Sequence, residues 1–141
     1  MNLVIDASVA IKWFIEEETS ALAASLLKEP ELLHAPDFLF VELANIAWKK
    51  VLRGDIGVEH AQLIAARAHE PFAALYPAAA LHERALEIAI ELQHPVYDCV
   101  YLACAEVVED GCLVTADRRF YNMVAGGRYS ALMKPLSSLA S

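Results

Sequence analysis

The sequence predicts an α/β fold built on a mainly parallel sheet. Short apolar runs rich in β-branched residues alternate along the chain with longer segments of helical periodicity, and this alternation is typical of parallel sheets. The chain has 141 residues, of which 57% are hydrophobic and 21% charged. This size and composition suit one folded domain with its own core and argue against disorder.

The first half of the chain contains strand and helix signals in alternation. Asp6 ends the first apolar run, and Gly54 stops a long helix that Asp37 caps. The expected elements are, in chain order, a buried strand at 2–6, helices at 8–15 and 18–28, a strand at 32–36, the long helix at 37–53, a helix at 58–69 and a strand at 73–76.

The second half begins with the clearest helix, which has one apolar face and an acidic stripe on another. Pro95 suits the first turn of the next helix, and Gly111 is expected to end that helix after Asp110. Asp117 then opens a short helix that a pair of glycines closes. The expected elements are helices at 79–93 and 95–110, a strand at 113–115, a helix at 117–124 and a strand at 131–134.

The chain is acidic, with a formal net charge of −8. This charge argues against a broad basic surface of the kind that grips duplex DNA, and it leaves room for a local basic patch and for a basic protein partner.

The cysteines have no metal-binding spacing and are expected to be buried free thiols. They are Cys99, Cys104 and Cys112. The N-terminus has no basic stretch before its apolar run. The longest uncharged run, Pro71–Leu81, is too short to span a bilayer. A soluble, cytoplasmic protein without a membrane segment is therefore expected.

Four carboxylates interrupt apolar sequence in this chain. They are Asp6, Glu42, Asp98 and Asp117. A buried carboxylate is costly unless something compensates it. Asp6 and Asp117 each follow a buried strand, and parallel sheets bind ligands beyond the carboxyl ends of their strands. Asp98 lies in the first turn of its helix and Glu42 in the second turn of its own. If these helix starts face the same edge of the sheet, the four acids meet there.

Three of the acids also have a purely structural interpretation. Asp6 and Asp117 would cap the helices that follow them, and Asp98 would suit the positive end of its helix dipole. Glu42 differs, because its helix is apolar almost all round except for one narrow polar line. That line consists of Glu42, Asn45, Lys49 and Arg53. We expect this helix to pack on the sheet, to meet a partner with another face and to offer the polar line to a cleft.

Hard oxygen ligands without paired His or Cys favour Mg²⁺ or Mn²⁺ over zinc or copper. The five histidines show no ligand spacing and are interpreted as surface or packing residues. A cation held by the four acids would activate water and neutralise charge on a phosphodiester, and an acid not fully engaged by the cation would serve as general base. Phosphate-loop, dinucleotide-binding and nucleophile-elbow motifs are missing, which disfavours an NTPase, a dinucleotide enzyme and an α/β-hydrolase.

Several other polar side chains are candidates for supporting roles. The hydroxyls of Ser8 and Thr115 would orient an acid, a metal-bound water or a phosphate, or would serve only as capping and strand-end groups; Asn45 is a further candidate on the polar line. A local basic rim for nucleic-acid phosphates is an alternative to an ordinary solvated surface. Its members would be Lys12, Lys49, Lys50, Arg53, Arg118 and Arg119.

Taken together, these residues resemble the PIN-domain ribonucleases, specifically the VapC-type toxins of bacterial and archaeal toxin–antitoxin pairs. Four motifs in a fixed order carry the resemblance, and they span nearly the whole chain. They are Val4–Val9, Ala35–Asp37 together with Glu42–Asn45, Tyr97–Ala103, and Val114–Phe120.

The resemblance implies a single PIN-like domain over residues 1–141, with a five-stranded, mainly parallel sheet flanked by helices on both sides. It implies Mg²⁺- or Mn²⁺-dependent endonucleolytic cleavage of RNA, with the four acids as metal-binding and catalytic residues and with Ser8 and Thr115 in support. It also implies a homodimer and a cognate antitoxin whose tail covers the active site. Some members place another acid shortly after the last Asp. Here Arg118 and Arg119 follow it, which leaves a second metal site less supported than the first.

Two other functions would use the same features. A PIN-like domain without turnover would be a protein-binding module, although the presence of all four acids argues against it. A phosphoacceptor domain like that of response regulators also places acids at strand ends, but it expects several acids after the first strand and a lysine after a late one. Asp6 stands alone after its strand, and Lys134 lacks the rest of that pattern.

Overall fold

Five parallel strands form the central sheet, in the order β3-β2-β1-β4-β5. The computed structural model of the chain describes residues 1–140. The strands are β1 (Asn2–Ile5), β2 (Leu33–Pro36), β3 (Ala74–Tyr76), β4 (Gly111–Thr115) and β5 (Met133–Pro135). Every neighbouring pair runs parallel, so each connection has to cross over the sheet. The predicted α/β fold with a five-stranded parallel sheet is confirmed.

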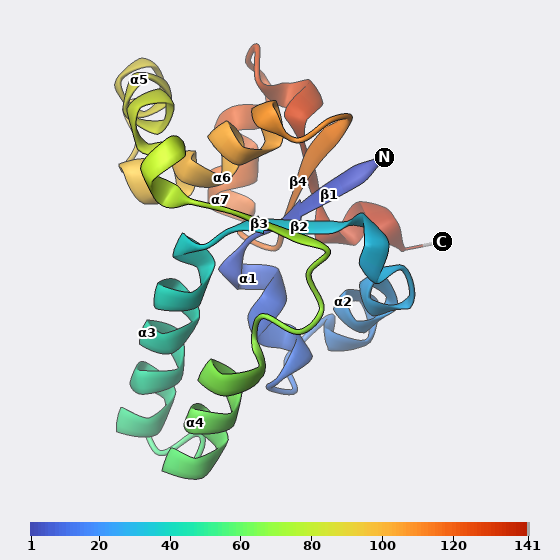
Figure 1. Cartoon of the computed structure of the whole chain (residues 1–141), viewed down its shortest axis with the longest axis vertical. Helices are drawn as coiled ribbons and strands as arrows, with labels where there is room; N and C mark the ends of the chain where they lie inside the picture. Colours follow the sequence, from blue (N-terminus) through green and yellow to red (C-terminus); the bar gives the residue numbers. More distant parts are fainter. Residues whose placement is uncertain (141) are drawn as a thin grey trace.

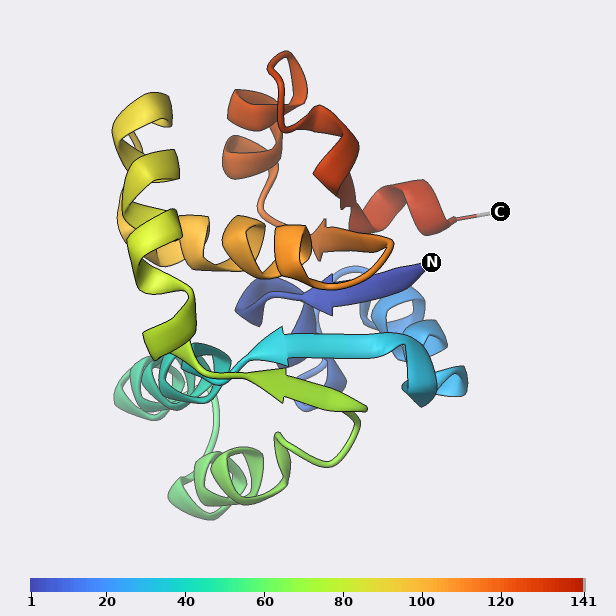
Figure 2. The same ribbon diagram turned by 45° about the horizontal axis from the view of Figure 1, so that its top comes forward.

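Helices cover both faces of the sheet. They are α1 (Ala7–Ala10), α2 (Ser20–Ser25), α3 (Phe38–Leu52), α4 (Val58–Arg67), α5 (His82–Leu92), α6 (Val96–Val107) and α7 (Arg118–Ala125). The helices α1 to α4 lie on one side of the sheet and α5 to α7 on the other (Figure 1, Figure 2). Right-handed crossovers explain this division, because the chain moves from β1 out to β3 and then returns to β4 and β5 in the opposite direction.

Short 3-10 turns join several of these elements. They lie at Ile11–Trp13, Leu26–Lys28, Pro30–Leu32, Ala78–Ala80, Ser130–Leu132 and Leu136–Leu139.

The strand order reverses direction between β1 and β4. The chain leaves β1 toward β2 and leaves β4 toward β5, so the helices that follow these two strands depart on opposite faces. Open parallel sheets bind ligands at such a point, beyond the carboxyl ends of the strands. The order also differs from the 2-1-3-4-5 order of response regulators, which argues against the phosphoacceptor alternative.

The core is built from the central strands and α6. Val4 on β1 and Val114 on β4 are 0% exposed, and every residue of Cys99–Ala105 on α6 is buried. The three cysteines are free and buried, as predicted, and burial raises the pKa of the Cys104 thiol to about 12, so it is not a nucleophile at neutral pH. Within residues 1–140, no helix is both long and apolar enough to cross a membrane.

The predicted helix at 8–15 is wrong in its extent. The helix α1 ends at Ala10, and the chain continues as the 3-10 turn Ile11–Trp13. Side-chain bonds to distant carbonyls hold this tighter turn: Lys12 Nζ donates to the Glu18 carbonyl at 2.7 Å, and Trp13 Nε1 donates to the Ala23 carbonyl at 2.9 Å. These contacts override the local helical pattern.

The predicted end of the helix at 95–110 is also corrected. α6 ends at Val107 instead of Asp110, which has a left-handed backbone with φ 51°, and Gly111 begins β4 instead of stopping the helix. A Cβ atom at Gly111 would lie 2.6 Å from the Ala105 carbonyl oxygen and 2.8 Å from that of Val108. The close passage of β4 against the end of α6 is therefore what requires glycine.

The prediction that the Asp37 side chain caps α3 is wrong. Asp37 stands just before the helix, but its backbone already has helical angles, with φ −66° and ψ −15°, and an N-cap side chain works from an extended backbone. Its Oδ1 accepts instead from the backbone nitrogen of Ala78, at 2.9 Å. Asp37 thus ties the start of α3 to the segment after β3.

The predicted strand at 131–134 begins later in the structure. It is β5 (Met133–Pro135), because a 3-10 turn occupies the residues before it.

We predict that Gly111→Ala lowers the free energy of unfolding by roughly 1–3 kcal/mol, since overpacking against fixed backbone atoms costs that much. Gly126→Ala is the matched control, because a Cβ atom there would meet nothing within 4 Å and its φ is −90°. Urea denaturation of both variants measures the difference. Equal stabilities would contradict the close passage at Gly111.

Candidate active site

All four predicted acids line one cleft of about 180 Å³ at the carboxyl ends of β1 and β4. Asp6 follows β1, Asp117 follows β4, Glu42 comes from α3 and Asp98 from α6. The rest of the lining consists of Ala7, Ser8, Ile46 and Tyr101. The four acids, which are far apart in the sequence, therefore converge as expected.

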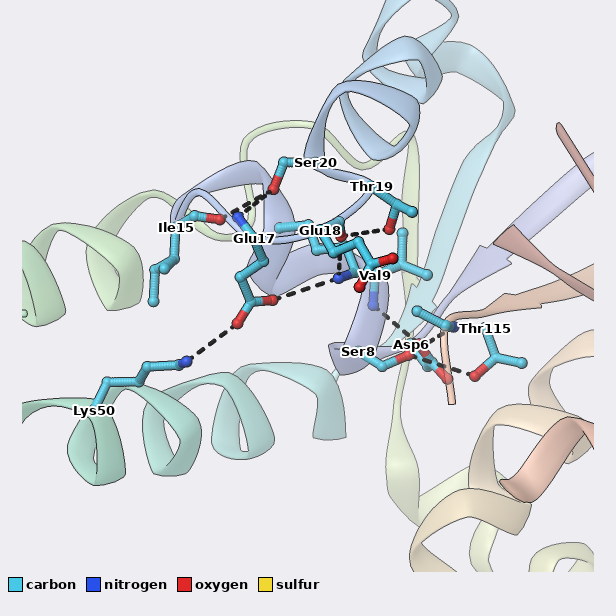
Figure 3. Close-up of polar contacts among 12 residues, drawn as sticks. Asp6, Ser8, Val9, Ile15, Glu17, Glu18, Thr19, Ser20, Lys50 and Thr115 are labelled. Carbon is cyan, nitrogen blue, oxygen red and sulfur yellow. Dashed lines mark hydrogen bonds and ion pairs between the residues drawn. The ribbon is translucent and has the colours of Figure 1, made fainter. Parts of the chain in front are cut away.

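Asp6 is the most buried of the acids, with 7% of its surface exposed. Its Oδ1 accepts from the Ser8 hydroxyl at 2.6 Å and from the backbone nitrogen of Val9 at 3.2 Å (Figure 3). Ile5 pairs with Val114 across β1 and β4, so the two strands deliver Asp6 and Thr115 at the same level of the sheet. Asp6 is both the N-cap of α1 and a wall of the cleft, so capping a helix does not keep it out of the cleft.

The Ser8 and Thr115 hydroxyls link the loops that follow β1 and β4. Ser8 Oγ accepts from the backbone nitrogen of Ala116 at 2.9 Å and lies 3.4 Å from Thr115 Oγ1, which accepts from the backbone nitrogen of Asp117 at 3.1 Å. The Ser8 hydroxyl proton points to Asp6, because its oxygen accepts from the other loop and the carboxylate has only acceptors. These two hydroxyls thus hold the ends of both central strands together.

Asp117 is the exposed member of the four. Its Oδ1 accepts from the backbone nitrogen of Phe120 at 3.1 Å and caps α7, so the structural interpretation is correct here too. This bond occupies one oxygen, and Asp117 also lines the cleft. Capping and a place in the cleft are therefore compatible.

Glu42 meets Tyr101 across the cleft. The buried Tyr101 hydroxyl donates a hydrogen bond to Glu42 Oε1. This contact joins α3, on one face of the sheet, to α6, on the other, beyond the strand ends. It also explains how a carboxylate is accommodated on an otherwise apolar helix.

Burial and like charges raise the pKa values of two of these acids. Desolvation raises the pKa of Asp6 to about 6, although its hydrogen bonds from Ser8, Thr115 and Val9 act in the opposite direction. Desolvation raises the pKa of Glu42 to about 7, the Tyr101 hydroxyl lowers it in part, and the charges of Asp98 and Asp6 add to the increase. Among residues 1–140, no positively charged group is therefore close enough to offset the increase in the pKa values of Asp6 and Glu42.

The donor chemistry of the cleft fits a hard divalent cation. Four carboxylates supply only oxygen ligands, and their mutual repulsion is what a cation would relieve. Within residues 1–140, however, no three His, Cys, Asp or Glu side chains already form a ligand group around one point.

The other predicted residues on α3 lie outside the cleft. Asn45, Lys49 and Arg53 are exposed, and Ile46, one turn after Glu42, takes the place in the lining that the polar line gave to Asn45. Lys12 is engaged elsewhere: its amine lies 3.5 Å from Glu17, which also binds Lys50 at 3.1 Å (Figure 3). The three side chains tie the loop after α1 to α3.

Arg118 and Arg119 follow Asp117 and line two hollows that share this residue with the cleft. Asp117 and Arg118 line a small hollow that reaches Thr19 and Tyr121. Asp117 and Arg119 line a second, larger hollow of about 540 Å³. The other residues of this hollow are His94, Pro95, Phe120 and Met123. Both hollows, each lined by an exposed arginine, thus adjoin the acidic cleft at Asp117.

The PIN domain family matches residues 3–125 of the chain. The chain belongs to the PIN-domain family. It is also 31% identical over 137 residues to Ribonuclease VapC3 of Pyrobaculum aerophilum, with 96% of this chain and 100% of that protein covered. The crystal structure of PAE2754 from Pyrobaculum aerophilum has a TM-score of 0.73 at 22% identity and covers 99% of this chain and 86% of that one, which supports the fold.

These comparisons confirm the resemblance to PIN domains of the VapC type that the four motifs predicted. The extension of this PIN domain over the whole of 1–141 stays a prediction, because the family match covers 3–125.

Sequence reasoning missed two residues of the PIN domain's cleft region. Tyr101, three residues after Asp98, binds Glu42, and His94, four residues before Asp98, binds Asp98 itself: His94 Nε2 lies 2.6 Å from Asp98 Oδ2. His94 was interpreted only as a surface or packing residue. For Tyr101 the available signal was its spacing of three residues from Asp98, because residues three apart share a helix face; His94 lies before the start of α6, so helical spacing gave no signal for it.

We predict that the metal-free protein loses stability as the pH rises from about 4 to about 7. Asp6 has a folded-state pKa of about 6 against an ordinary value of 3.8, so the folded state holds a proton that the unfolded state has released. Stability therefore falls with pH across this window, by on the order of 2–3 kcal/mol for Asp6 alone.

Urea denaturation in EDTA at a series of pH values measures this effect. Asp6→Asn is the matched variant, because it keeps the shape and removes the charge, and its curve should be the flatter one. Parallel curves for the two proteins would contradict a raised pKa at Asp6.

Proposed function

We propose that this PIN domain is an Mg²⁺- or Mn²⁺-dependent endoribonuclease and the toxin of a type II toxin–antitoxin pair. One observation carries the proposal: four carboxylates from four separate elements line a single cleft at the point where the strand order reverses. The similarity to Ribonuclease VapC3 supports RNA as the substrate, which carboxylates alone do not identify.

In this proposal Asp6, Glu42, Asp98 and Asp117 hold the cation. When bound, the cation supplies Lewis-acid stabilisation of the phosphodiester and lowers the pKa of water. The chain prepares the ligands. Asp6 is oriented by Ser8, and Glu42 is oriented by Tyr101. The Glu42 oxygen Oε2 accepts no hydrogen bond within residues 1–140, so it would be free to take the proton of the attacking water.

The two hollows beside Asp117 support a path for RNA across the cleft. Arg118 and Arg119 stand in separate hollows that share Asp117, so a strand that fills both would pass the acids at its centre. Its phosphates would meet one arginine on each side. Lys49 on α3 and Arg53 directly after it are exposed and are further candidates for contacts with a longer RNA. Lys12 is a weaker candidate because Glu17 already pairs with it.

The groove between α3 and α4 supports the proposed antitoxin. Its lining is almost wholly apolar: Ala44, Ala47, Trp48, Val51, Val58, Ala61, Gln62 and Ala65. The nearby Trp48 and Leu52 are 57% and 71% exposed, and an amphipathic helix is a suitable partner for such a groove. A net charge of −8 favours a partner with basic residues. This groove fits the expectation that α3 meets a partner with one face.

A second apolar surface supports the proposed homodimer. Leu86 and Ile90 are exposed one turn apart on α5, and a pair of copies would cover them.

The buried free thiols suit a reducing compartment, and we therefore propose a cytoplasmic location for the protein.

The first test is cleavage of a structured RNA transcript by the purified protein. We predict that EDTA abolishes cleavage, that Mn²⁺ restores it, and that Asp6→Asn lowers the rate by at least about 100-fold, because Lewis-acid stabilisation is worth several kcal/mol. Asp55→Asn is the matched control, since Asp55 is an exposed carboxylate in the turn after α3, and it should leave the rate unchanged.

Cleavage that survives both EDTA and Asp6→Asn would rule out the proposed site. Calorimetry separates the remaining alternative, a catalytically silent PIN-like binding module: a protein that neither binds Mn²⁺ nor cuts RNA, yet captures its antitoxin, would establish that alternative.

The second test concerns the arginines beside Asp117. We predict that Arg118→Ala and Arg119→Ala, each in the Asp6→Asn background, weaken binding of a fluorescent oligouridylate. Each should also reduce the slope of log affinity against log salt by about 0.7, the value for one lost phosphate contact on a single strand. Arg67→Ala removes a charge from the far end of α4, where Arg67 pairs with Glu70, and should leave the slope unchanged. Three equal slopes would contradict the path.

A further inference from the structure

His94 stands between the acid of α6 and the helix α7. Its Nε2 lies 2.6 Å from Asp98 Oδ2, and its ring stacks on Phe120 with the ring centroids 5.0 Å apart and the planes 19° from parallel. An ionised carboxylate only accepts hydrogen bonds, so Nε2 carries the proton of this bond. The pair is half-shielded from water, with the His94 side chain 21% and that of Asp98 34% exposed.

The contact with Phe120 extends this link to a second acid. Phe120 is 2% exposed, and its backbone nitrogen donates to Asp117 Oδ1 at 3.1 Å. A continuous series of contacts therefore runs from Asp98 through His94 and Phe120 to Asp117. Pro95 follows His94 and restricts its backbone, which keeps the imidazole in place.

We propose that His94 is a positioning residue of the metal site: its Nε2 proton fixes Asp98, while its ring fixes the first turn of α7 and with it Asp117. The proposal rests on the proposed function, and it adds to it a residue outside the four acids. The bond to Oδ2 leaves Asp98 Oδ1, which accepts no hydrogen bond within residues 1–140, available to a cation.

The hydrogen bond and the stack make separable contributions. The bond holds one carboxylate oxygen and so selects which oxygen faces a cation; hydrogen-bonded neighbours of metal ligands typically change metal affinity by 10–100-fold. The stack only packs two aromatic rings and contributes to folding. A purely structural His94 would act through the stack alone.

Two substitutions separate these contributions. His94→Phe keeps a ring on Phe120 and removes the donor, whereas His94→Gln keeps an amide donor and removes the ring. Calorimetric titration with Mn²⁺ should give a dissociation constant about 10–100-fold weaker for His94→Phe and close to wild type for His94→Gln. In RNA cleavage, His94→Phe should lower kcat more than it changes KM, because the loss lies at the reacting centre. His69→Phe, at an exposed histidine, is the control and should match wild type in both assays.

The outcomes are distinct. Wild-type Mn²⁺ affinity in His94→Phe, or equal weakening in both variants with equal losses of thermal stability, would overturn the role of the donor. No Mn²⁺ binding by the wild type would overturn the metal site itself, and His94's role with it.

The unmodified protein provides an independent check should His94→Phe fail to fold. Its imidazole ¹⁵N spectrum should show His94 as the Nε2-protonated tautomer, with shifts that change on addition of Mg²⁺; a different tautomer, or shifts insensitive to Mg²⁺, would contradict the proposal.

Discussion

The parallel pairing of β1 with β4 is the constraint on which the site depends. It is the pairing at which the strand order reverses, so the chain enters helices on opposite faces at the same level of the sheet and leaves a crevice between them. Asp6 and Thr115 stand at that level, buried to 7% and 1% exposure. A carboxylate in this position costs free energy, and hydrogen bonds from Ser8 and Val9 offset part of the cost. The site thus exists at the expense of some stability in the metal-free protein.

Each of the four acids has its own donor, and the donors come from a short distance in the chain or from the facing helix. Asp6 uses α1, Asp117 uses α7, Asp98 uses the residue before Pro95, and Glu42 uses α6. These bonds hold the four carboxylates near one another in spite of the repulsion between their charges. They also orient the carboxylates, because a carboxylate with one oxygen bound has lost most of its rotational freedom. Little further ordering would then oppose a cation.

The local pattern and the expectation of a parallel sheet were enough to predict which acids would meet if the helix starts face one edge, but not which side chains surround them. Asp6 and Asp117 follow buried strands, and that alone places them at one edge of a parallel sheet. The rotation of α3 about its own axis could not be predicted in this way. Asn45 and Ile46 both lie about one turn after Glu42, and contacts with α1 and α4 decide which of them faces the cleft. Contacts between side chains and residues far away in the sequence could not be predicted either. Asp37 binds Ala78 and Lys50 binds Glu17, and no periodicity encodes such partners.

Sequence alone left a choice between helix cap and metal ligand for Asp6 and Asp117, and in the structure each of them both caps a helix and lines the cleft. A cap needs one oxygen of the carboxylate and a backbone nitrogen of the next turn, and both residues use Oδ1 for this bond. Burial favours the neutral form of a carboxylate, whereas capping favours the charged form, because a hydrogen bond to a carboxylate lowers its pKa. Capping therefore helps to keep the acid ionisable where a cation would need it. A strand end followed at once by a helix start is then a suitable place for a ligand, since the cap that begins the helix also holds the acid.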